Sequence, residues 1–257
     1  MRTDLVERPT SEDDPTGGAG SRYRAALALL ASRQKPGAGV PAYTRWVNRR
    51  AARRIAAAAH ALGVSANTVT ILSAAVSALA VVALLALPTG WVTGVVVAVL
   101  LAAGYVLDSA DGQVARLSGT AGPSGEWLDH VVDAIRTPVV HLAVLVALAR
   151  DGAPDWALVV TLAYCVLAVG QFMSQILAEQ LLGRPPLPAT GPARRQSLVL
   201  LPTDTGTFCW LFVLWGGPVL FVAAYTSMFA LNLFHAAVSM RRKYVRLRLH
   251  ERKGPTS

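Results

Sequence analysis

Two neighbouring segments of the sequence carry four carboxylates at helical spacing: Asp108-Ser-Ala-Asp111-Gly112-Gln-Val-Ala115-Arg116 and, after eight further residues, Gly125-Glu-Trp-Leu-Asp129-His-Val-Val-Asp133. The first pair is three residues apart and the second pair four, so each pair projects from one face of a helix. A turn over residues 118–122 would fold the helices back on each other and bring both pairs together. Four carboxylates in one place repel one another unless cations bind, and oxygen ligands favour Mg²⁺ or Mn²⁺. We therefore expect a metal site with two ions at Asp108, Asp111, Asp129 and Asp133.

The composition of the 257-residue chain is that of an integral membrane protein. Hydrophobic residues make up 53%, charged residues only 15%, and the mean hydropathy is +0.44. The formal net charge is +9, although residues 1–14 are acidic. Because the basic residues flank apolar segments, this charge favours an anionic lipid surface or anionic substrates over nucleic acid. Both cysteines fall in apolar segments, which predicts reduced, structural thiols.

The N-terminal part of the chain divides at residue 41. Residues 1–40 are rich in charged residues, Pro, Gly and Ser, and we expect most of them to be disordered, with no secretory signal. Residues 41–62 alternate aromatic and aliphatic side chains with arginines, a pattern typical of an amphipathic helix in the membrane interface. A solvated charged helix is the alternative, but it would leave Tyr43 and Trp46 exposed without reason.

The remaining apolar segments predict an all-α polytopic protein with six transmembrane helices between residues 67 and 240. Ser65 or Asn67 caps the first helix, and residues 183–196, with four prolines, form a loop. Pro202-Thr203-Asp204 makes the beginning of the fifth span uncertain. The expected apolar spans are 68–87, 91–107, 134–149, 156–182, 198–215 and 218–240.

The distribution of Lys and Arg predicts the orientation in the membrane. The turns at 88–90 and 216–217 carry no basic residue and the turn at 150–155 carries Arg150, whereas the other side holds many, including the tail at 246–257. By the positive-inside rule, both termini and the carboxylates face the cytoplasm, at a cell inner (plasma) membrane. Carboxylates at the cytoplasmic mouth favour an enzyme over a transporter, because a relay through the bilayer places its ionisable groups nearer the midplane.

The pattern Asp108-x2-Asp111-Gly112-x2-Ala115-Arg116-x8-Gly125-x3-Asp129-x3-Asp133 resembles the signature of the CDP-alcohol phosphotransferases (CDP-alcohol phosphatidyltransferases). The likeness covers roughly residues 41–245. It implies that an acceptor hydroxyl attacks the β-phosphorus of a CDP-linked donor, commonly CDP-diacylglycerol, and releases CMP in phospholipid biosynthesis. It also implies a homodimer.

The resemblance assigns roles to the carboxylates and to the residues around them. Asp108, Asp111 and Asp129 would bind metal, and Asp133 would share the second ion and act as general base. A carboxylate in reach of the attacking hydroxyl can take its proton, and paired metal ions can neutralise the pyrophosphate. The residues expected to contact the CDP group are Asn67, Thr70, Asp111, Gly112, Ala115, Arg116 and Gly125.

The sequence leaves the acceptor open between serine, glycerol 3-phosphate and a sugar-like alcohol. Arg136, Arg194 and Arg195 are candidate contacts to an anionic acceptor, although Arg136 could equally pair with an aspartate and the other two could simply mark the cytoplasmic side. The branch that uses inositol phosphate tends to carry Lys-Ala-Arg at the end of the fourth helix, where this chain has Ala178-Glu179-Gln180, which counts against that acceptor.

Two alternative functions use the same carboxylates. One keeps the chemistry but takes a soluble CDP-alcohol as donor and a lipid hydroxyl as acceptor. The other is a divalent-cation transporter or membrane scaffold, which predicts metal flux without nucleotide.

Overall fold

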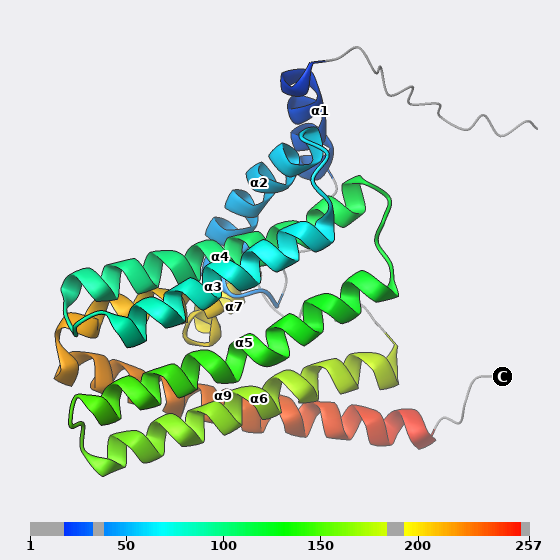
Figure 1. Ribbon diagram of the computed structural model, residues 1–257. Coiled ribbons are helices and arrows are strands. Elements are labelled where there is room, and N and C mark those ends of the chain that lie inside the picture. Colours follow the sequence, from blue (N-terminus) through cyan, green and yellow to red (C-terminus); the bar gives the residue numbers. More distant parts are fainter. Residues whose placement is uncertain (1–17, 33–38, 184–192, 253–257) are drawn as a thin grey trace, which may run out of the picture.

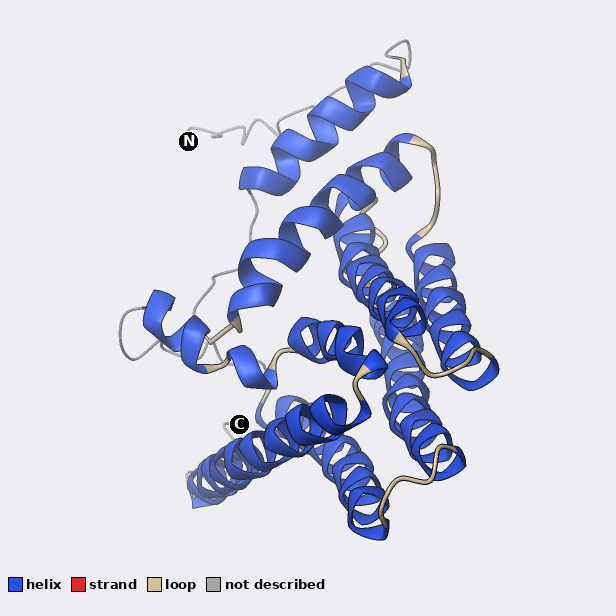
Figure 2. Ribbon diagram, turned by 90° about the vertical axis from the view of Figure 1, so that its left-hand side faces the viewer, coloured by secondary structure: helices blue, strands red, loops and turns tan. Residues whose placement is uncertain are grey.

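The computed structural model describes residues 18–32, 39–183 and 193–252, and within these ranges the chain forms helices and no strand (Figure 2). The elements in chain order are α1 (Ala19–Ser32), the π-helical turn η1 (Thr44–Asn48), α2 (Arg49–Ala61), α3 (Ala66–Ala86), α4 (Trp91–Leu117), α5 (Pro123–Arg150), α6 (Asp155–Leu182), α7 (Ala193–Val199), the 3₁₀ turn η2 (Leu201–Thr203), α8 (Thr205–Leu211), the 3₁₀ segment η3 (Phe212–Gly216) and α9 (Pro218–Arg252).

Five of the described helices, α3, α4, α5, α6 and α9, are long and apolar enough to cross a membrane. They run side by side, while α1 and α2 cross the bundle on one side (Figure 1). Large apolar side chains are exposed along all five helices, as expected where lipid surrounds the bundle. The prediction of an all-α polytopic membrane protein is therefore confirmed.

The fifth predicted span, residues 198–215, is a series of short helices. Asp204 accepts a hydrogen bond from the backbone N–H of Gly206 at 3.0 Å and so caps α8, where a continuous helix was expected. The short apolar helix of residues 205–216 is about 18 Å long at about 1.5 Å per residue, against a bilayer core of about 30 Å. The predicted loop at 183–196 also ends early, because α7 begins at Ala193, and residues 184–192 lie outside the described part.

The predicted disorder of residues 1–40 is wrong for residues 19–32, which form α1. This segment is rich in Ala and Leu, which favour helices, and Ala26 and Leu30 lie four apart on one buried face. Leu30 packs with Ala52 and Ala56 of α2. Helix α1 is therefore stabilised by a partner distant in sequence. Residues 1–17 and 33–38 lie outside the described part.

The predicted amphipathic helix at 41–62 corresponds to η1 and α2. One face of α2 is made of buried alanines that pack against α1 and α4, while Arg50 and Arg54 are exposed. Figure 1 shows α2 running across the long helices, unlike any of the five spans. At the other end of the chain, α9 continues as helix through residues 246–252, and residues 253–257 lie outside the described part.

Helices α3 and α4 approach each other closely one turn before the first carboxylate. Gly104 of α4 faces Ser73 and Ser77 of α3, and a Cβ at this glycine would collide with Ser77 Oγ. A larger residue would push the helices apart. The close approach places the polar face of α3, including Thr70, beside the aspartates of α4.

Candidate active site

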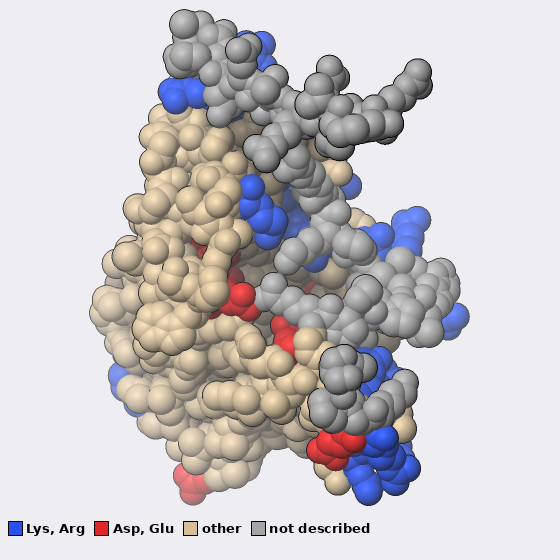
Figure 3. Space-filling view, turned by 90° about the vertical axis from the view of Figure 1, so that its right-hand side faces the viewer, with Lys and Arg blue, Asp and Glu red and all other residues tan. Residues whose placement is uncertain are grey.

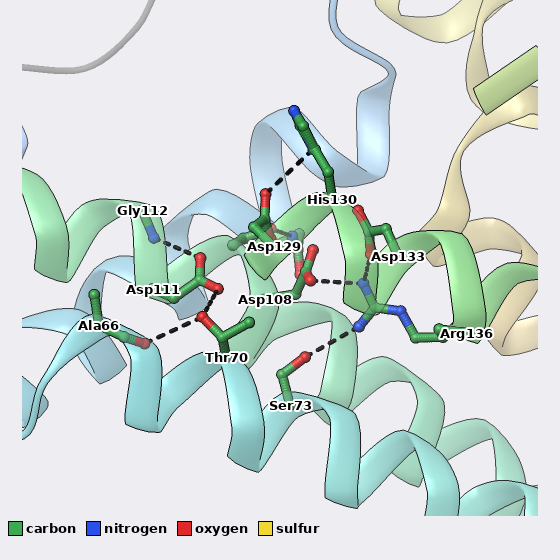
Figure 4. Close-up of polar contacts among 12 residues, drawn as sticks. Ala66, Thr70, Ser73, Asp108, Asp111, Gly112, Asp129, His130, Asp133 and Arg136 are labelled. Carbon is green, nitrogen blue, oxygen red and sulfur yellow. Dashed lines mark hydrogen bonds and ion pairs between the residues drawn. The ribbon is translucent and has the colours of Figure 1, made fainter. Parts of the chain in front are cut away.

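The α4–α5 turn brings the two pairs of carboxylates together as the spacing predicts. Helix α4 ends at Leu117, Gly119 takes a positive φ of 65°, and α5 begins at Pro123. Helices α4 and α5 both pack against α3, and their aspartates face each other across the space between the two helices (Figure 4). Asp108, Asp111 and Asp129 each offer one oxygen, and these three oxygens lie within 4.8 Å of one another.

Helix α3 orients one of these carboxylates. The hydroxyl of Thr70 lies 2.7 Å from Asp111 Oδ2, to which it donates, and 3.2 Å from the carbonyl oxygen of Ala66 (Figure 4). Thr70 is 3% exposed and Asp111 6%. Such a bond fixes the rotamer of Asp111 and leaves lone pairs of its carboxylate for a cation.

Arg136, one turn beyond Asp133 on α5, is the cation of the site. Its Nη2 lies 2.6 Å from Asp108 Oδ1 and also contacts Asp133 Oδ1, while its Nη1 donates to Ser73 Oγ at 3.0 Å (Figure 4). The guanidinium therefore joins α3, α4 and α5. Of the two roles left open by the sequence, pairing with aspartates is the one that the geometry displays.

The carboxylate cluster fits a divalent cation. Asp108, Asp111 and Asp129 supply only oxygen ligands; Arg136 is in direct contact with Asp108, and His130 Nδ1 lies 3.8 Å from Asp129 Oδ2. Four carboxylates against one guanidinium leave the site strongly negative, a balance that a bound metal would correct. Asp133 lies outside the group of three and pairs with Arg136, so its predicted part in metal binding stays a prediction.

A cavity of about 900 Å³ opens beside the carboxylates. In Figure 3 acidic side chains are visible inside a hollow that has Lys and Arg around it. All the residues predicted to contact the CDP group line this cavity, and they come from α3, α4 and α5: Asn67, Thr70, Asp111, Gly112, Ala115, Arg116 and Gly125. We call it the donor cavity.

Two glycines of the donor cavity, Gly112 and Gly125, are not required by the packing of the protein itself. A Cβ at Gly112 would meet only Arg116 Nη1, at 3.6 Å, and one at Gly125 would meet only Asn67 Oδ1, at 3.7 Å. Both are ordinary contacts. Their missing side chains therefore leave space inside the cavity, which favours a role in ligand binding over one in helix packing.

Helix α9 adds residues to the donor cavity that the sequence pattern did not indicate, and two predicted acceptor contacts lie outside its lining. Helix α9 contributes Lys243 and Arg246 to the lining, although the sequence analysis treated these residues only as marks of the cytoplasmic side. Lys243 and Arg246 lie three residues apart, so their side chains share one face of the helix, and this spacing is the sequence feature that could have indicated a common site. Arg194 and Arg195 are exposed on α7 and line neither this cavity nor the second one described below.

Asp204 is a buried acid that was not predicted as a site residue, and its hydrogen bonds stabilise the region next to the first two aspartates. Asp204 is 2% exposed and accepts hydrogen bonds from the N–H of Thr44 at 2.8 Å and from its hydroxyl at 2.7 Å. The same hydroxyl lies 2.7 Å from the phenol of Tyr105, one turn before Asp108. This cluster ties η1 and α8 to the helix that carries the first two aspartates.

Comparison with known proteins agrees with this geometry. Among curated proteins no match was found. Residues 63–240, more than half of the chain, match the family model described as CDP-alcohol phosphatidyltransferase, and the matched range contains the four aspartates and the lining of the donor cavity except Lys243 and Arg246. The chain belongs to the CDP-alcohol phosphatidyltransferase family.

Proposed function

We propose that the protein transfers a phosphatidyl group from CDP-diacylglycerol to the hydroxyl of an alcohol and releases CMP, with Mg²⁺ or Mn²⁺ as cofactor and two ions at the site. The observation that carries this proposal is the donor cavity, in which every residue expected to contact CDP lines the same space as Asp111 and Asp129. A soluble CDP-alcohol would use the same CDP contacts, so the lipid part of the donor is inferred from the membrane setting.

In the proposed reaction the acceptor oxygen forms a bond to the β-phosphorus, and the bond from that phosphorus to the CMP oxygen breaks. Asp133 takes the proton of the attacking hydroxyl. Bound divalent ions at Asp108, Asp111 and Asp129 would neutralise the pyrophosphate and the leaving CMP. Arg116 provides a fork of donors to phosphate oxygens, and Arg136 keeps Asp133 in place through their ion pair.

We further propose that the α4–α5 turn and both termini face the cytoplasm, at the inner (plasma) membrane. The α4–α5 turn and the C-terminal end of α9 lie at the same end of the bundle (Figure 1). This end carries Arg116, Lys243 and Arg246, as the positive-inside rule requires. CDP-linked donors and metal ions would reach the carboxylates from that side. By family resemblance the protein forms a homodimer, which crosslinking in native membranes would test.

The test is CMP release by the purified protein in lipid vesicles that contain CDP-diacylglycerol, with Mg²⁺ or Mn²⁺ and one acceptor alcohol at a time. We expect release that depends on an acceptor and stops when the metal is chelated. Asp133→Asn should lower the rate by about a hundredfold to ten-thousandfold, because the general base is lost, while CDP-diacylglycerol still binds.

Asp155→Asn is the matched control. Asp155 is exposed at the beginning of α6, at the far end of the bundle, and this change should leave the rate unaltered. Near-normal turnover in Asp133→Asn would contradict the assigned base. Metal flux into vesicles without nucleotide, together with absence of CMP release, would favour the transporter instead. A preference for a soluble CDP-alcohol would correct the donor but keep the chemistry.

A further inference from the structure

A second cavity, of about 400 Å³, lies inside the bundle beside Arg136. It is lined by residues of all five long helices and of η2 and α8, and it shares Gln175 and Lys243 with the donor cavity. Arg136, which contacts Asp133, belongs to its lining. A molecule bound here would therefore adjoin both the proposed general base and a donor in the neighbouring cavity. We call this space the inner cavity.

Several polar side chains line the inner cavity between the membrane helices, among them Ser77, Gln171, Gln175, Asn232 and His235. Polar side chains between membrane helices are costly unless they are paired or functional. Part of this set is structural, since the amide of Asn232 donates to the phenol of Tyr164 at 3.0 Å and to the carbonyl of Pro202 at 3.0 Å. The bond to Pro202 gives a hydrogen-bond donor to a backbone carbonyl in the irregular segment before α8. His141 similarly meets Tyr225, at 2.6 Å.

Other polar groups of the lining are left for a ligand. Ser77 is 4% exposed, and its hydroxyl has no hydrogen-bond partner among the described residues. Gln171 and Gln175, one turn apart on α6, use their amide nitrogens toward His235 and Glu179. Their carbonyl oxygens remain able to accept hydrogen bonds from hydroxyl groups.

The charges of the lining do not suit a phosphate. Of its three charged side chains, Arg136 is bonded to Asp108, Asp133 and Ser73, and Asp204 is bonded to Thr44 and Gly206. The third, Lys243, lies where the inner cavity meets the donor cavity. Phosphate-bearing ligands are usually held by several uncommitted arginines or lysines.

From these observations, and resting on the function proposed above, we infer that the acceptor binds in the inner cavity and is an uncharged alcohol with several hydroxyl groups. Its hydroxyl groups would form hydrogen bonds with Ser77, Gln171, Gln175 and His235. Each of these groups can donate to or accept from a hydroxyl, and none needs a formal charge on the ligand. The volume lies within the range of small-molecule sites. Acceptors that carry phosphate or an ammonium group are thereby disfavoured.

The experiment compares acceptors in the CMP-release assay: glycerol and myo-inositol, glycerol 3-phosphate and inositol phosphate, and serine. We expect an uncharged polyol to give the highest kcat/KM, at least about tenfold above its phosphorylated form. Gln171→Leu should raise the KM for the polyol about tenfold, which corresponds to a loss of about 1.4 kcal/mol of binding free energy. The KM for CDP-diacylglycerol should stay unchanged. Gln180→Leu, on the exposed surface of the same helix and outside both linings, is the matched control.

Binding provides a second readout that does not depend on turnover. Tritiated polyol should bind to the Asp133→Asn variant in the presence of CDP-diacylglycerol and lose affinity when Gln171→Leu is added. Higher kcat/KM with a phosphorylated alcohol or with serine, or an unchanged polyol KM in Gln171→Leu, would overturn this inference and leave the proposed transfer intact. Absence of CMP release with every acceptor would overturn the proposed function and the inference with it.

Discussion

Arg136 bridges two carboxylates on different helices, and its removal should weaken the protein most when no metal is bound. Arg136→Gln leaves Asp108 and Asp133 without their partner, and loss of one member of a buried ion pair costs about 3 to 5 kcal/mol. The side chains of Arg136, Asp108 and Asp133 are 18%, 14% and 26% exposed, so water screens them partly and the lower end applies. About 3 kcal/mol corresponds to a fall in Tm of about 6 to 12 °C for a chain of this size.

A divalent cation should compensate for the missing guanidinium. With Asp108, Asp111 and Asp129 bound to metal, the repulsion that Arg136 relieves is already reduced, so saturating Mg²⁺ should narrow the difference in Tm between variant and wild type. Thermal unfolding in detergent, with chelator and with Mg²⁺, measures both quantities without any substrate.

Arg150→Gln is the matched control for this experiment. Arg150 pairs with Asp151 at 3.1 Å and donates to the carbonyl oxygen of Leu85 at 2.6 Å at the opposite end of the bundle, and its side chain is 42% exposed. The exposed pair contributes about 0 to 1 kcal/mol and the hydrogen bond about 1 kcal/mol, so the fall in Tm should be smaller than for Arg136→Gln and independent of metal. Equal Tm for Arg136→Gln and wild type in chelator, or a difference that Mg²⁺ does not alter, would refute the reasoning.

Three further predictions concern residues around the site. Asp204→Ala removes the cap of α8 and both acceptors of Thr44, and should lower the free energy of unfolding by about 2 to 4 kcal/mol; a Tm equal to wild type would show that the cluster contributes nothing. Gly206→Ala places a Cβ against the ring of Tyr43, and should cost about 1 to 3 kcal/mol in the same assay unless the ring moves freely. Gly112→Ala meets no such obstacle, so Tm should stay constant while the KM for CDP-diacylglycerol rises about tenfold; an unchanged KM would mean that the donor does not approach this glycine.

The carboxylate motif was predictable because its information is local. Spacings of three and four residues place side chains on one helical face whatever the surroundings, and the short turn after Leu117 reverses the chain, so that the aspartates near the beginning of α5 return toward those near the end of α4. The donor cavity follows from the same hairpin and from Asn67 and Thr70 on the preceding helix. Long apolar segments likewise predict membrane helices from composition alone.

Features that depend on contacts between distant segments were not predictable in this way. Helix α1 is too short to be stable alone, and the alanine face of α2 provides the packing that it lacks. For Arg194 and Arg195 the sequence left two roles open, acceptor contact or mark of the cytoplasmic side, because basic residues in a cytoplasmic loop and in a binding site look alike in sequence. The tertiary structure places them on the exposed surface of α7, away from both cavities.

The membrane class, the family signature and the residues predicted for the metal and donor sites can all be read from the amino-acid order, because hydropathy and helical spacing act within one or two neighbouring helices. Only the tertiary structure decided what Arg136 contacts, where the fifth span breaks and which polar groups meet inside the bundle. Asp204 shows why: it caps the beginning of α8 locally, but the Thr44 groups that allow its burial lie 160 residues earlier in the chain. Such a partner is fixed by packing in three dimensions, and no local pattern encodes it.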